Sequence, residues 1–117
     1  MTFRLVIHVN DDSRERLTAA INMAYNLIDV VGERDVDAAI VFNWRGPAAL
    51  LRGGLDNYTR ERINELLGMG VRVYVCSISM RSLGLRKEDL IEGVELVDSG
   101  VKKIVELQSQ GYAYVKA

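Results

Sequence analysis

Residues 3–42 read FRLVIHVNDDSRERLTAAINMAYNLIDVVGERDVDAAIVF and contain the pattern that decides the fold class. Phe3–Val9 and Val36–Phe42 are short, apolar and rich in β-branched residues, which predicts two buried strands. Between them, apolar residues recur at helical spacing from Leu17 to Val31, which predicts an amphipathic helix. A strand, a helix and a second strand in this order predict two parallel strands joined by a crossover helix.

The same alternation continues through the rest of the chain, with no linker or repeat. The further predicted strands are Val71–Cys76, Val94–Val97 and Tyr112–Val115. The further predicted helical segments are a short piece at Ala48–Arg52, a helix that Thr59 caps and a helix that Ser99 caps. Residues 77–92 are expected to form a loop with one or two short helical turns. This order of elements predicts a three-layer α/β/α fold with a mostly parallel five-stranded sheet.

Length and composition predict one domain over residues 1–117, since 49% of the residues are hydrophobic and 26% are charged. Fifteen basic and sixteen acidic residues give a net charge of −1, which argues against a dedicated nucleic-acid binder. No apolar run approaches the roughly 18 residues that span a bilayer, and residues 1–9 are too few for a signal peptide. We therefore expect a cytoplasmic protein without a membrane partner.

Cys76 is the only cysteine and His8 the only histidine of the chain. This excludes an intrachain disulfide and a structural zinc site, which needs about four such ligands. No glycine-rich nucleotide fingerprint follows a predicted strand. We therefore expect neither a metal nor an organic cofactor, and any second thiol must belong to another molecule.

Cys76 ends a predicted strand, and ligands of open parallel sheets bind beyond the carboxyl ends of the strands. Two interpretations stay open, a catalytic nucleophile and a packed core cysteine. The residues expected to line the site are His8, Asn10, Asn43, Arg45, Gly46, Ser77 and Arg81. Arg45 and Arg81 are the candidates for the positive charge that would lower the thiol pKa. His8 is either a hydrogen-bonded packed residue or a proton partner of the thiol.

Two other comparisons fit the sequence less well. Asp11 and Asp12 resemble the acidic pair of phosphoryl-accepting receiver domains, but such domains need a carboxylate where this chain has Cys76. A helix cap supplied by Asp12 or Ser13 is the favoured explanation of these residues. Cys76 and Arg81, with four residues between them, resemble the anion-binding loop of rhodanese-type sulfurtransferases, yet those four residues include no glycine.

Five segments, in order along nearly the whole chain, carry a family resemblance. They are NMAYNL (22–27), GPAALL (46–51), GVRVYVCSISM (70–80), EDLIEGV with VDSGV (88–101) and QSQGYAYVK (108–116). Together they resemble the DsrE/DsrF-like sulfur-relay superfamily of the YchN and TusD type. The resemblance implies a small α/β domain that assembles as trimers or hexamers. It also implies that Cys76 carries sulfur as a persulfide between donor and acceptor proteins.

One residue departs from the family pattern. Many relatives have histidine before the glycine that follows the second strand, and this chain has Arg45 there. Arginine can supply the charge of that histidine but not its proton transfer, because it stays protonated. The first functional hypothesis is therefore a sulfur carrier with Cys76 as acceptor nucleophile. The alternative is a non-catalytic oligomeric module that binds a small ligand or a partner and in which Cys76 is structural.

The chain is expected to form a homo-oligomer, either a trimer or a hexamer of two trimers. Trp44 lies in a predicted loop and Tyr112 and Tyr114 in the last predicted strand, where a chain this small has little to cover them. Aromatic residues of this kind are enriched in interface cores. Light scattering after size exclusion, in reductant and at micromolar concentration, measures the mass directly. A single species near the chain mass of 13.1 kDa would contradict the expectation.

Overall fold

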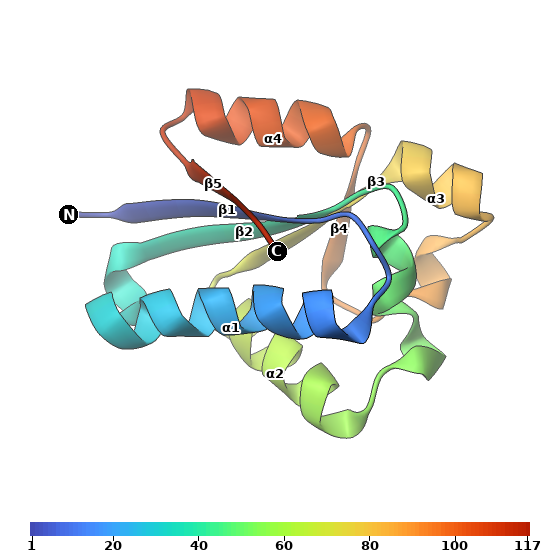
Figure 1. Cartoon of the computed structure of the whole chain (residues 1–117), viewed down its shortest axis with the longest axis horizontal. Helices are drawn as coiled ribbons and strands as arrows, with labels where there is room; N and C mark the ends of the chain where they lie inside the picture. Colours follow the sequence, from blue (N-terminus) through green and yellow to red (C-terminus); the bar gives the residue numbers. More distant parts are fainter.

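The computed structural model describes all 117 residues, which form a parallel sheet between two helical layers (Figure 1). The strands are β1 (Phe3–Val9), β2 (Val36–Phe42), β3 (Arg72–Cys76), β4 (Val94–Val97) and β5 (Ala113–Lys116). The helices are α1 (Arg14–Val31), α2 (Asn57–Gly68), α3 (Ser77–Leu83) and α4 (Gly100–Ser109). The strand order is β4-β3-β2-β1-β5, and every neighbouring pair is parallel. None of the helices has the length and apolar character that a bilayer crossing requires.

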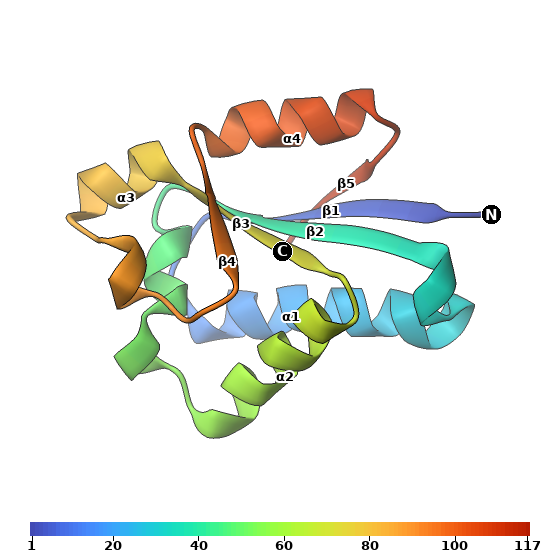
Figure 2. The same cartoon turned by 180° about the vertical axis from the view of Figure 1, so that it is seen from behind.

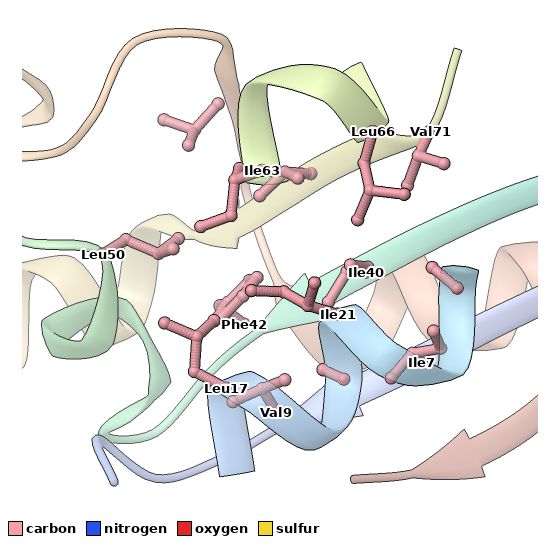
Figure 3. Packing of buried hydrophobic residues seen from close by; sticks show 14 of the residues in the cluster. Ile7, Val9, Leu17, Ile21, Ile40, Phe42, Leu50, Ile63, Leu66 and Val71 are labelled. Carbon is pink, nitrogen blue, oxygen red and sulfur yellow. The ribbon is translucent and has the colours of Figure 1, made fainter. Parts of the chain in front are cut away.

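The two faces of the sheet carry different layers. Helices α1 and α2 cover one face and α4 covers the other, as the opposite views of Figures 1 and 2 show. On the first face, Ile7, Ile40 and Phe42 pack with Leu17 and Ile21 in the larger core cluster (Figure 3). The α4 face carries a smaller buried cluster, made of Val6, Ala39, Val41, Tyr74, Ile104, Leu107 and Tyr112. The predicted three-layer α/β class is confirmed.

The cap residues of α1 and α2 were both predicted from the sequence, and the prediction is correct for α1 only. Ser13 caps α1, because its Oγ accepts the N–H of Arg16 at 3.0 Å. The predicted cap of the second long helix, Thr59, is wrong. That helix begins at Asn57, and the carboxylate of Asp56 accepts the N–H of Thr59 at 3.2 Å. Asp and Thr are both good cap residues, so local preference alone does not choose between them.

Two irregular segments are more helical than predicted. The piece predicted at Ala48–Arg52 is two 3₁₀ helices, Gly46–Leu50 and Arg52–Gly54. The predicted loop after Cys76 begins with helix α3, which ends where Gly84 adopts a left-handed φ of 69°. Met80 of α3 is buried in the larger core cluster. This packing supports a helix too short to show apolar periodicity.

The prediction that the chain leaves Tyr112 uncovered is wrong. This residue lies just before β5 and is buried in the α4-face cluster. Its hydroxyl donates to Asp37 at 2.6 Å and accepts from Arg72 at 2.8 Å. The chain therefore covers this side chain itself, whereas Trp44 and Tyr114 stay exposed.

Gly46→Ala is expected to destabilise the protein by about 1–3 kcal/mol, the usual cost of overpacking a tight site. A Cβ atom on Gly46 would overlap the backbone carbonyl oxygen of Val9, which cannot move without disturbing β1. Gly53→Ala is the matched control, because a Cβ atom there meets nothing within 4 Å. Urea denaturation measures both. Equal stability of the two variants would contradict this packing.

Candidate functional site

The candidate site lies at the carboxyl edge of the sheet, on the face that α4 covers. Cys76 ends β3, Asn43 follows β2, and Gly100 is the first residue of α4. A Cβ atom on Gly100 would lie 2.9 Å from the Cβ of Asn43 and 3.2 Å from the Cβ of Cys76. Glycine therefore lets the amino end of α4 pack directly on the two residues that end neighbouring strands.

The Cys76 thiol experiences two opposing influences. The residue is only 5% exposed, and burial raises the pKa of the thiol because it disfavours the charged form. The hydroxyl of Ser79 and the backbone N–H groups of Gly100, Ser79 and Ile78 stabilise the thiolate. Together these hydrogen-bond donors outweigh burial and hold the pKa of Cys76 below its ordinary value. The donors near the sulfur thus favour its anionic form.

Ser79 connects the sulfur to the loop after β2. Its side chain is buried, and its Oγ accepts the backbone N–H of Trp44 at 2.8 Å. That bond occupies an acceptor position and leaves the hydroxyl proton for another acceptor. Ser79 is also among the groups that lower the pKa of Cys76. Trp44 has a φ of 55°, the left-handed region that a bulky residue adopts at a cost of about 1–3 kcal/mol. The bond to Ser79 helps to hold it there.

His8 is engaged by two partners other than the thiol. Its Nε2 lies 2.6 Å from Oδ1 of Asn43, and its Nδ1 lies 2.6 Å from the hydroxyl of Tyr114. An amide oxygen only accepts, so Nε2 carries a proton, and in the neutral ring Nδ1 accepts from the tyrosine. Both ring nitrogens of His8 are thus bonded to groups other than the thiol of Cys76. This arrangement matches the packed, hydrogen-bonded interpretation of the histidine.

Neither arginine singled out in the sequence is among the main influences on the thiol pKa. Those influences are burial, which raises the pKa, and hydrogen-bond donors, which lower it. Arg45 is exposed in the loop after β2, and Arg81 is exposed on α3. Neither has a carboxylate within the 4.0 Å of an ion pair or a side-chain hydrogen-bond partner in the structure.

The other predicted residues lie around the edge of the site without contacting the sulfur. Asn10 follows β1, is half-buried and bonds to neither His8 nor Cys76. Gly46 is buried against the carbonyl oxygen of Val9. Ser77 begins α3, but the hydroxyl at the thiolate belongs to the serine two residues later. No group of three or more His, Cys, Asp or Glu side chains is placed to hold a metal ion.

A sequence model of the DsrE/DsrF-like family matches residues 4–117. The chain belongs to this family. The DsrE/DsrF-like family is associated with sulfur relay in general. A comparison with curated proteins finds no match.

Solved structures resemble this DsrE/DsrF-like chain over its whole length. MTH1491 of Methanobacterium thermoautotrophicum, a protein of unknown function, is 34% identical, with a TM-score of 0.86 over 98% of this chain and 99% of that one. The ychN protein of E. coli is 16% identical, with a TM-score of 0.77 over 100% of both chains. BT1422 of Bacteroides thetaiotaomicron, of unknown function, is 14% identical, with a TM-score of 0.72 over 97% and 94%. The last two likenesses concern the fold alone.

Four residues of the site in this DsrE/DsrF-like protein were not predicted as site residues. They are Ser79, through its side chain and its N–H, and Trp44, Ile78 and Gly100, through their backbone N–H groups. The sequence does contain signals for a helix after Cys76. Gly84 is placed to end such a helix, and Ser79 is the third residue after the cap, a position that often forms hydrogen bonds with the cap residue. Gly100 has no such signal, because its role depends on packing between α4 and β3.

Ser79→Ala is expected to raise the pKa of Cys76, because it removes a hydrogen bond to the thiolate. At neutral pH less thiol is then ionised, and alkylation by iodoacetamide slows by roughly tenfold, the factor for about 1.4 kcal/mol of lost bonding to a charged group. The rate profile against pH shifts to higher pH. Ser77→Ala, one residue beyond Cys76, is the matched control and should leave the profile in place. Identical profiles for both variants would show that Ser79 does not act on the sulfur.

Proposed function

We propose that this protein is a sulfur carrier, which holds sulfur as a persulfide on Cys76 and passes it to a thiol of a partner protein. The observation that carries the proposal is the position of Cys76 at the carboxyl end of β3, directly before α3 and against the first residue of α4. The donors of these two helices lower the pKa of the thiol and so favour the thiolate. The thiolate is the nucleophilic form in sulfur exchange. Membership of the DsrE/DsrF-like family supports the same chemistry.

Loading is an exchange of one sulfur–sulfur bond for another. The Cys76 thiolate attacks the outer sulfur of a donor persulfide, and a bond forms between the two sulfur atoms. The bond within the donor persulfide breaks, and its electron pair leaves on the donor's inner sulfur as a thiolate. The proton of the outer sulfur stays with it or passes to solvent. No external oxidant or reductant is consumed, and no metal or organic cofactor takes part.

The carrier requires other protein molecules on both sides of the exchange. With one cysteine per chain, the donor and acceptor thiols come from partner proteins or from other copies. We propose a trimer or hexamer of this chain, which the exposed side chain of Tyr114 supports. A cytoplasmic setting suits the chemistry, because it keeps a lone thiol reduced between cycles.

One observation favours a second candidate function, a non-catalytic binding module with a structural cysteine. Cys76 is only 5% exposed, so a partner thiol reaches it only after a local opening of the site. A packed cysteine would stay inert to alkylation until the protein unfolds. A carrier cysteine would react in the folded protein, and faster at neutral pH than an ordinary thiol does.

Incubation with a sulfane-sulfur donor is expected to add one sulfur atom, about 32 Da, to each chain at Cys76. Intact-mass measurement under non-reducing conditions detects the addition, and dithiothreitol should remove it. Cys76→Ser is the control and should gain no mass. Equal gain in both proteins, or no gain while a control thiol is loaded in the same tube, would refute the proposed function.

A further inference from the structure

A small apolar groove lies between the loop after β2 and helix α3. It has a volume of about 290 Å³ and is lined by Trp44, Arg45, Ile78, Ser79, Ser82 and Leu83. The side chain of Trp44 is 69% exposed and that of Ile78 is 51% exposed, although both are strongly apolar. The volume is at the lower limit of pockets for small-molecule ligands, which suits one large side chain of a protein segment.

The charge around the groove has one sign. Arg45 is a wall residue, no acidic side chain lines the groove, and Arg45 has no ion-pair partner. Arg81, one helical turn beyond Ile78 on α3, is exposed and also unpaired. An occupant with a carboxylate beside its apolar side chain is therefore complementary to this surface.

The groove and the thiol share a residue. Ser79 lines the groove, and its hydroxyl is also among the groups that lower the pKa of Cys76. The backbone of Trp44, which forms the opposite wall, is hydrogen-bonded to the same hydroxyl at 2.8 Å. A segment seated in the groove thus contacts a residue that also acts on the sulfur.

We propose that this groove is the docking site for the acceptor protein, and that it receives an extended segment with a large apolar side chain, a cysteine and a carboxylate. The apolar side chain packs between Trp44, Ile78 and Leu83, and the carboxylate pairs with Arg45. Exposed aromatic residues of this kind are frequent anchors of protein interfaces. The inference rests on the proposed function, since it names the partner that takes the sulfur from Cys76.

Unloading at this position balances without an added reagent. The acceptor thiolate attacks the outer sulfur of the Cys76 persulfide, and a new sulfur–sulfur bond forms on the acceptor. The bond to Cys76 breaks, and its electron pair stays on the Cys76 sulfur. The resulting thiolate returns to the donors of Ser79, Ile78 and Gly100, which stabilise it as a leaving group.

The test uses three synthetic peptides and the full-length protein. The peptides are acetyl-Gly-Leu-Cys-Asp-Gly-amide, a version with Ser in place of Leu, and a version with Lys in place of Asp. Trp44 is the only tryptophan, so its fluorescence reports occupation of the groove. Binding is measured on Cys76→Ser, which cannot exchange sulfur, and transfer is measured on persulfide-loaded wild type.

The Leu/Asp peptide is expected to bind and to accept sulfur best. The Ser version, which lacks the apolar side chain, should have about tenfold lower affinity and a roughly tenfold lower rate of sulfur transfer. The Lys version should lose about threefold in each, as for an exposed ion pair. Arg45→Glu should reverse the preference between the Asp and Lys peptides. Val105→Ser removes an exposed apolar side chain from α4, outside the groove, and should change neither.

Equal affinity for the three peptides, or an unchanged preference in Arg45→Glu, would overturn the docking proposal. So would a shift of Trp44 emission with protein concentration alone, because a second copy of the chain would then occupy the groove. Tight binding of N-acetylleucine would assign the groove to a small acid instead. A further outcome separates the two proposals. If Cys76→Ser binds the three peptides with the expected preference but wild type takes up no persulfide, the docking site stands and only the carrier function is refuted.

Discussion

The close approach of α4 to the sheet at Gly100 is the constraint on which the site depends. The absence of a side chain there allows the first turn of α4 to lie against both Cys76 and Asn43. One N–H of that turn then stabilises the thiolate, and the rest of the helix covers the sheet with Ile104 and Leu107. The packing of a whole layer and the chemistry of one sulfur atom thus have a common geometric cause.

Burial and hydrogen bonding act on the thiol in opposite directions, and their balance makes the site chemically useful. A buried thiol without donors would stay protonated and unreactive, whereas an exposed thiolate would be open to oxidation. Here the donors outweigh burial, so the pKa of the thiol lies below its ordinary value although the residue is buried. The strained backbone of Trp44 belongs to the same arrangement, because its N–H donates to Ser79, whose hydroxyl lowers the pKa of Cys76.

Most of the fold could be predicted because its signals are local. The buried strands Phe3–Val9 and Val36–Phe42 have the predicted bounds, and α1 ends as predicted before Gly32. The errors arose where two local signals compete or where packing decides. Asp56 and Thr59 are both good caps, and α3 is stabilised by burial of Met80 rather than by its own periodicity.

By itself, the sequence determined the α/β class and the position of Cys76 at the end of a strand, because apolar periodicity and strand length are properties of neighbouring residues. Only the tertiary structure decided what surrounds the sulfur. Its donors come from the first turns of α3 and α4, and Ser79 is held by the loop after β2. The sequence suggested Arg45 and Arg81 as charge partners of the Cys76 thiolate, but both are exposed in the structure. The direction of a side chain depends on how its helix or loop packs, which the sequence does not give. Segments distant in sequence meet only when the sheet brings its strand ends together.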